Sequence, residues 1–349
     1  MECVVHGDDF TILGFKDDLD DLAEKMGKWF EIKVRGELGP EINDDKVISI
    51  LNRTLTWKDW GIELVSDPKH AERLIEYFGL EANSTTAVSI GKKDVVDKLE
   101  LVGEDEGEEE EAEPLGSKDQ SIYRGLAATL NYLAQDRYDI QFGAKELCRE
   151  MAKPTTSPMS KMKRAARYLL GLPILKIEFV EQFSQENILV FVDSDWAGCL
   201  ATRKSTSGGV VMNGKHCIKT WASTQATRAT SSAEAEFYAI VEGASRGLGL
   251  KSLAKDMGIN VNIVMYSDAS AGRSLAFRKG LGKVRHIETK YLWIQDIIKE
   301  GRIKLLKIKG TDNPADIGTK HLSISEMSGF LVGMGLKIIP RQMVRVQGA

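Results

Sequence analysis

An acidic run near residue 110 limits how this chain can fold. Eight of the ten residues from Glu104 to Glu113 are Asp or Glu. The run lacks apolar periodicity and its charges repel one another, so we expect a solvated, disordered linker between folded parts. A mimic of nucleic-acid charge is the alternative interpretation. The formal net charge is −4, yet without this run the chain has 43 acidic and 47 basic residues, so the folded parts are mildly basic.

Length and composition indicate a globular protein inside the cell. A chain of 349 residues is long enough for two compact domains. It has no run of 18 apolar residues and no basic N-terminal segment leading into an apolar one, which argues against a membrane span or a secretory signal. Cys3, Cys148, Cys199 and Cys217 form no C-x-x-C pair, which argues against disulfides and zinc and fits a reducing compartment. We expect a cytoplasmic or nuclear location.

The first half of the chain reads as strands followed by helices. Its pattern predicts two short strands around a tight turn at 7–9, a helix over 17–30, strands over 30–34, 47–55 and 61–65, and a helix over 67–80. Asp67 and Pro68 suit the N-cap and first position of that last helix. After the acidic run, helices are predicted over 122–150 and 160–170.

From Ile188 onward the pattern predicts a mixed sheet. Residues 188–192 are all apolar, as expected of a buried central strand. Asn213-Gly214, between two apolar stretches, predicts a hairpin with a type I′ turn. A helix over 231–257, a strand over 262–266, helices over 269–277 and 287–299, a strand over 302–308 and a helix from Asn313 follow. This order predicts an α+β fold, with helices packed on a mixed five-stranded sheet.

Four carboxylates occupy the rims of these elements. Asp193 and Asp268 directly follow two apolar strands, Glu236 lies in the first long helix, and Asp316 lies in the first turn of the last helix. Oxygen ligands without His or Cys favour Mg²⁺ or Mn²⁺ over Zn²⁺. Two such ions can activate water and stabilise the leaving oxygen in phosphodiester hydrolysis.

Each carboxylate also has an ordinary structural interpretation. Asp268 could cap its helix, and Asp316 could complement a helix dipole. Glu234 is an alternative to Glu236 as the glutamate of the helix, and Asp195 is an alternative to Asp193 as the carboxylate after the first strand. Only the joint pattern favours a catalytic site.

That joint pattern resembles the ribonuclease H domain of copia-type LTR retrotransposons. The matching segments, in order, are 191–198 (FVDSDWAG), 203–209 (RKSTSGG), 231–239 (SSAEAEFYA), 266–271 (YSDASA), 285–288 (RHIE) and 313–320 (NPADIGTK). The resemblance implies a ribonuclease H fold that cuts the RNA strand of RNA–DNA hybrids. It also implies that Asp193, Glu236, Asp268 and Asp316 form the catalytic set and bind two Mg²⁺, for which Mn²⁺ can substitute.

The sequence departs from this family at one position. Cellular relatives carry a histidine shortly before the last aspartate, whereas residues 309–312 read KGTD here. His286 lies on a different element, so we assign it a structural role.

An acid-free stretch suggests how the substrate is held. No Asp or Glu lies between Trp196 and Ala233. We expect its basic and hydroxyl side chains to contact sugar and phosphate, and so to recognise hybrid shape and 2′-hydroxyls rather than sequence. An exposed polar hairpin is the alternative. The proposed contacts are Arg203, Lys204, Ser205, Thr206, Ser207, Lys219, Arg228 and Ser231.

The N-terminal half resembles part of a reverse transcriptase. Gly7-Asp8-Asp9 is similar to the paired-aspartate turn of these polymerases, although it also suits a plain hairpin. The segments 123–126 (YRGL), 131–134 (NYLA) and 165–171 (AARYLLG) are similar to the region joining polymerase and ribonuclease H in copia-type Pol polyproteins. Nucleotide transfer needs a further carboxylate from an earlier strand, which would precede Asp8. We therefore expect a polymerase remnant that is inactive alone.

These observations divide the chain as follows. We predict a partial reverse-transcriptase palm at 1–80, an acidic linker at 81–120, a helical thumb or connection at 121–180, a ribonuclease H domain at 181–325 and a C-terminal tail at 326–349. The expected partners are an RNA–DNA hybrid and other Pol products. The alternative is a non-catalytic binding remnant, or an accessory subunit of an intact polymerase.

Overall fold

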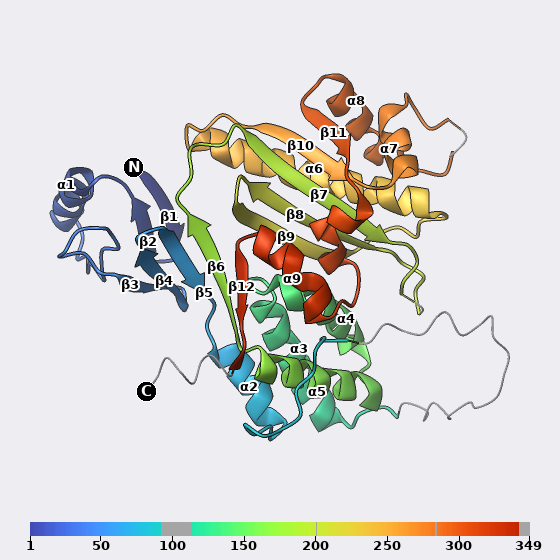
Figure 1. Ribbon diagram of the computed structural model, residues 1–349, viewed down its shortest axis with the longest axis horizontal. Coiled ribbons are helices and arrows are strands. Elements are labelled where there is room, and N and C mark those ends of the chain that lie inside the picture. The colour runs from blue at the N-terminus through green and yellow to red at the C-terminus, as the bar shows by residue number, and fades with distance from the viewer. Residues whose placement is uncertain (92–112, 200, 283–284, 342–349) are drawn as a thin grey trace.

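The structure is a computed structural model in which residues 1–91, 113–199, 201–282 and 285–341 are described (Figure 1). The acidic run up to Ala112 lies outside these residues, so its disorder stays a prediction. In the described part of the chain, no helix has the length and apolar character needed to cross a membrane. The four cysteines are free, as the scattered spacing predicts.

The chain begins with a separate hairpin. Strands β1 (Glu2–His6) and β2 (Asp9–Leu13) pair antiparallel, and helix α1 (Lys16–Gly27) follows. Gly7 has φ +63° in the turn, a conformation that glycine adopts without strain. Residues 31–37, within and beyond the strand predicted at 30–34, form no strand.

An antiparallel sheet draws on distant parts of the chain. Its order is β12 (Leu336–Ile339), β6 (Ile174–Val180), β5 (Gly61–Val65), β4 (Arg53–Lys58) and β3 (Val47–Ile50). The strand predicted over 47–55 is two strands, because Leu51 and Asn52 both have positive φ and form a tight turn. The structure places β12 and most of α9 (Ile324–Gly333) where the sequence predicts a tail.

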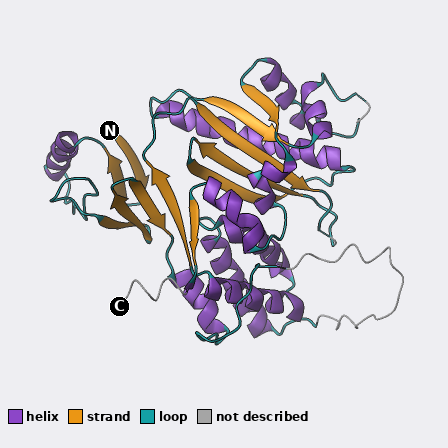
Figure 2. Ribbon diagram, viewed as in Figure 1, coloured by secondary structure: helices purple, strands orange, loops and turns teal. Residues whose placement is uncertain are grey.

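Four helices form their own core beside this sheet (Figure 2). They are α2 (Lys69–Tyr77), α3 (Ser117–Leu133), α4 (Tyr138–Arg149) and α5 (Thr156–Gly171), and the 3₁₀ turn η2 (Glu150–Ala152) follows α4. The single helix predicted over 122–150 is divided between Leu133 and Tyr138. Arg137 lies in this break, fully buried, and its guanidinium bonds the Asp139 carboxylate at 2.7 and 2.9 Å.

The second sheet confirms the predicted α+β fold with a mixed five-stranded sheet. Its order is β11 (Ile303–Lys307), β10 (Asn262–Ser267), β7 (Asn187–Asp195), β8 (Thr206–Asn213) and β9 (His216–Thr224). β7, β8 and β9 run antiparallel, whereas β10 and β11 run parallel to β7. The predicted Asn213-Gly214 hairpin is present, with Gly214 at φ +58°.

Helices cover both faces of the mixed sheet. α6 (Ser232–Asp256), α7 (Ser270–Phe277), the turn η3 (Thr289–Tyr291) and α8 (Trp293–Lys299) lie on one side, where their apolar residues pack on Val190 and Val192. On the other side α4, α9 and the 3₁₀ turn η5 (Pro314–Gly318) pack near Val210 and Met212 (Figure 1). The 3₁₀ turn η4 (Gly310–Asp312) precedes η5 in the chain. The helix predicted from Asn313 is thus a short 3₁₀ turn followed by α9.

Candidate active site

Two of the predicted carboxylates meet because their strands are parallel. Asp193 closes the apolar part of β7, and Asp268 follows β10, which pairs with β7 in parallel. The carboxyl ends of parallel neighbours lie at one edge of a sheet, so both side chains reach the same place. The N-cap of α7 is Ala269 and makes no side-chain cap bond, so the structure gives Asp268 no capping role.

Glu236 reaches the same edge from the second turn of α6. One oxygen from each of Asp193, Glu236 and Asp268 lies within 4.8 Å of the other two. A Cβ at Gly272 would lie 2.6 Å from the Cβ of Glu236, so α7 crosses α6 closely at this point. The Glu236 Oε2 atom is buried and has no hydrogen-bond partner.

The rival Glu234 has a structural role instead. It is 1% exposed, and its carboxylate accepts hydrogen bonds from the Thr230 N–H at 2.9 Å and the Tyr238 hydroxyl at 2.6 Å. His286 Nε2 lies 2.8 Å from the same carboxylate, which agrees with the structural role assigned to that histidine. Ser231 caps α6 by accepting from the Glu234 N–H at 3.3 Å.

Asp316 lies beside the cluster rather than within it. Its carboxylate is 2.9 Å from the Lys320 ammonium, which is also 3.9 Å from Asp193 Oδ2. Thr319 donates a hydrogen bond to the same Asp193 oxygen. The Asp316 Oδ1 atom is buried without a hydrogen-bond partner. The sequence analysis missed Lys320 and Thr319, although the i,i+4 spacing from Asp316 to Lys320 is a recognisable ion-pair pattern.

Burial and mutual repulsion disfavour the charged forms of these carboxylates. Burial raises the pKa of Asp193 to about 7, although the Lys320 charge acts in the opposite direction. Burial, with the charges of Asp193 and Asp268, raises the pKa of Glu236 to about 8. Burial lowers the pKa of Lys320, but the carboxylates of Asp193 and Asp316 outweigh it and the net shift is upward. Close carboxylates with raised pKa values favour a bound cation.

The donor set fits a hard divalent cation. The ligand atoms are carboxylate oxygens, and the group contains no thiol or imidazole. One carboxylate oxygen of Glu236 and one of Asp316 are buried without a hydrogen-bond partner, which costs desolvation free energy. A bound cation would offset that cost. Asp195, the rival of Asp193, is outside the group.

The predicted nucleic-acid contacts divide into exposed and buried sets. Arg203, Lys219, Arg228 and Ser231 are exposed, and Lys204 is half-buried. Ser205, Thr206 and Ser207 are at most 4% exposed, so their hydroxyls do not face solvent. They bond the Ala197 N–H, the Lys145 ammonium and the Gln225 side-chain amide, respectively.

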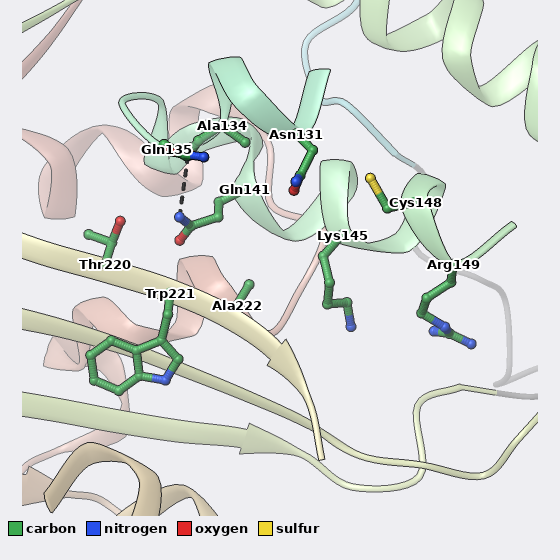
Figure 3. Close-up of a pocket in the computed structure, with 10 residues that line it drawn as sticks. All are labelled: Asn131, Ala134, Gln135, Gln141, Lys145, Cys148, Arg149, Thr220, Trp221 and Ala222. Carbon is green, nitrogen blue, oxygen red and sulfur yellow. Dashed lines mark hydrogen bonds between the residues drawn. The ribbon is translucent and has the colours of Figure 1, made fainter. Parts of the chain in front are cut away.

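Lys145 lines a pocket of about 390 Å³ between α3, α4 and β9. Figure 3 shows Lys145 and Arg149 extending from α4 beside the strand that carries Thr220, Trp221 and Ala222. Glu146 is 2.5 Å from the Lys145 ammonium and 2.7 Å from the Arg149 guanidinium. None of the four predicted catalytic carboxylates lines this pocket.

The paired aspartates of the N-terminal turn stand apart from this site. Asp8 and Asp9 lie at the β1–β2 turn, and Asp9 is 3.1 Å from the Arg35 guanidinium. Within the described residues, the one group of three or more acidic, His or Cys side chains with metal-binding spacing is the cluster at Asp193.

Two plant proteins are similar in sequence to most of this chain. The retrovirus-related Pol polyprotein from transposon TNT 1-94 of Nicotiana tabacum is 25% identical over 351 residues, which cover 95% of this chain and 24% of that protein. The corresponding protein from transposon RE1 of Arabidopsis thaliana is 29% identical over 225 residues, 64% of this chain and 15% of that protein. Homologues of this chain are plant retrotransposon Pol polyproteins. The resemblance found in the motifs is thereby confirmed, and the chain spans less than a quarter of these relatives.

No family model matches the chain. A ribonuclease H1 isolated from compost is similar in structure, with a TM-score of 0.29 and 12% identity over 39% of this chain and 94% of that one. A foamy viral protease–reverse transcriptase in complex with double-stranded DNA has a TM-score of 0.41 and 9% identity over 76% of this chain and 46% of that one. The fold is defined by the strand orders of the two five-stranded sheets.

Proposed function

We propose that residues 181–325 form a ribonuclease H domain that hydrolyses the RNA strand of RNA–DNA hybrids. The observation that carries this proposal is the carboxylate group of Asp193, Glu236 and Asp268, with ligand atoms within 4.8 Å at one sheet edge. A module that only binds nucleic acid needs cations for the phosphates rather than converging carboxylates. The Pol homologues support the same function.

Mg²⁺ is the proposed cofactor, bound as two ions, and Mn²⁺ can substitute. When bound, such a pair supplies an activated water and stabilises the leaving oxygen of the phosphodiester. Asp193, Glu236 and Asp268 would hold one ion, and Asp316 with Asp193 would hold the other. Asp193 is thus proposed as the shared ligand, and Thr319 fixes its orientation by a hydrogen bond to Oδ2.

The backbone around Asp193 keeps this arrangement in place. Asn313, fully buried, donates to the Val192 carbonyl at 2.9 Å and so ties the start of η5 to the end of β7. A Cβ at Gly208 would lie 2.7 Å from Thr319 Cγ2 and 2.8 Å from the Ala315 carbonyl oxygen. The close approach of β8 to η5 therefore depends on this glycine.

The proposed partner is an RNA–DNA hybrid, held by exposed cations of the acid-free stretch between Trp196 and Ala233. Arg203, Lys219 and Arg228 are exposed and can contact phosphates without giving up a buried partner. The buried hydroxyls at 205–207 would act indirectly, by shaping the strand that carries them. Such contacts recognise shape and sugar rather than base sequence.

Cleavage of a 5′-labelled RNA–DNA hybrid tests the function. Wild-type protein should cut the RNA strand with Mg²⁺ and not with EDTA, and should leave a matched DNA duplex intact. Asp193→Asn should lower the rate by at least about a hundredfold, because it removes the shared ligand. Asp195→Asn is the matched control and should retain most of the activity. Equal loss in both variants, or a folded wild type that binds hybrid without cutting it, would reject the proposal.

We also propose that this chain alone does not extend a primer. Asp8 and Asp9 form a pair without a third described carboxylate at metal-binding distance, whereas metal-dependent nucleotide transfer needs a fuller ligand set. Incubation with a primed template, Mg²⁺ and nucleoside triphosphates should give no extension. Template-dependent incorporation that is lost in Asp8→Asn would show the opposite.

A further inference from the structure

Lys320 brings a positive charge into the carboxylate site from the chain itself. Its ammonium is 2.9 Å from Asp316 Oδ2 and 3.9 Å from Asp193 Oδ2, and its side chain is 46% exposed. It therefore bridges the two residues proposed to hold the second ion, and it has a free path to solvent. Asp316 itself lies outside the group of three converging carboxylates.

Charge balance indicates that Lys320 affects the binding of the second ion more than that of the first. Four ionised carboxylates carry four negative charges, which two divalent ions neutralise without help. With a single divalent ion at Asp193, Glu236 and Asp268, two negative charges are left over, and the Lys320 ammonium neutralises one of them. An ammonium and a divalent ion cannot occupy the same carboxylate oxygens, and they repel each other at short distance.

We propose that Lys320 is a built-in counter-ion that occupies the Asp193–Asp316 side of the site and must be displaced by the second divalent ion. This inference rests on the proposed two-ion site and adds an order to it. The first ion binds the three converging carboxylates and leaves the Lys320–Asp316 ion pair in place. The second binds more weakly, because it must separate Lys320 from Asp316 and Asp193. The released ammonium then reaches solvent, where a substrate phosphate can attract it.

Calorimetric titration of the full chain with Mg²⁺ alone measures this directly, without substrate or turnover. Wild type should show one tighter and one weaker class of site. Lys320→Met should strengthen the weaker class about tenfold, the effect expected from removing one close positive charge. Lys320→Arg keeps the charge and should retain the weak class. Lys304→Met, which removes an exposed lysine on β11, is the matched control and should match wild type.

A variant of Asp316 checks that the weaker class is the site that Lys320 covers. Asp316→Asn should abolish the weaker class and leave the tighter class in place, because Asp316 is proposed to hold only the second ion. Thermal unfolding of each variant confirms that the titrated protein is folded. Unchanged constants in Lys320→Met, or a weaker class that remains in Asp316→Asn, would overturn the inference. Two binding classes without hybrid cleavage would instead reject the proposed function and leave the role of Lys320 standing.

Discussion

Binding of Mg²⁺ should release protons from the carboxylate site, by an amount that depends on pH. Burial raises the pKa of Asp193 to about 7 and that of Glu236 to about 8. A divalent cation binds the ionised carboxylates, so any proton held in the metal-free protein must leave. At pH 6 both groups are mostly protonated, and saturation with Mg²⁺ should release about two protons per chain. At pH 9 both are mostly ionised, and release should fall to about 0.1 proton.

The sign of the affinity change follows from the same shifts. Protons compete with the metal below the two pKa values, so Mg²⁺ affinity should rise with pH up to about 9 and then level off. An ordinary surface carboxylate, with a pKa near 4, would give no change over this range. The steepness of the rise therefore reports how strongly the fold desolvates Asp193 and Glu236.

Calorimetry in buffers of different ionisation enthalpy measures the released protons. At each pH, observed binding enthalpy falls linearly with the ionisation enthalpy of the buffer, and the magnitude of this negative slope equals the number of protons released. Glu236→Gln, titrated at saturating Mg²⁺, should lower the release at pH 6 by about one proton. Release near zero at pH 6 in the wild type would show that both carboxyls are already ionised, and would refute the argument from burial.

Two further predictions concern the framework around the site. Arg137→Met should lower the free energy of unfolding by about 3–5 kcal/mol in urea titration, because it leaves the buried Asp139 charge without its partner; a loss below about 1 kcal/mol would contradict this. Gly208→Ala should weaken Mg²⁺ binding and slow hybrid cleavage, because the added methyl group would meet Thr319 at 2.7 Å. Gly249→Ala, whose Cβ meets nothing within 4 Å, is the control for the latter and should leave both properties unchanged.

The positions of Asp193 and Asp268 were predictable because they follow from short, local sequence patterns. An apolar run that ends in a carboxylate places that carboxylate at a sheet edge, and this holds for Asp193 and Asp268 alike. The parallel pairing of β7 with β10 then brings the two together. The choice between Glu234 and Glu236 was only partly local. Thr230 and Tyr238 lie four residues before and after Glu234, but its third partner, His286, comes from a distant segment of the chain.

The burial of the hydroxyls at 205–207 could not be predicted from their own segment. Their neighbours in the sequence are basic and polar, which suggests an exposed strand. Helix α4 approaches from a distant part of the chain, and its Lys145 donates to Thr206 Oγ1 at 2.6 Å. The break at Arg137 has a similar cause, because its partners include the Leu172 and Pro173 carbonyls on the far side of α5.

Contacts around η5 cross the predicted domain boundary at residue 181. The Tyr138 hydroxyl of α4 lies 3.4 Å from the Pro314 and Ala315 carbonyl oxygens. A Cβ at Gly318 would lie 2.9 Å from that hydroxyl, so η5 is held closely between α4 and the sheet. This turn positions Asp316, and Thr319 and Lys320 follow it directly. The helical segment before residue 181 therefore forms part of the support of the candidate active site, although it supplies none of the proposed metal ligands. The α-helical core and the mixed sheet are better treated as one structural unit than as two independent domains.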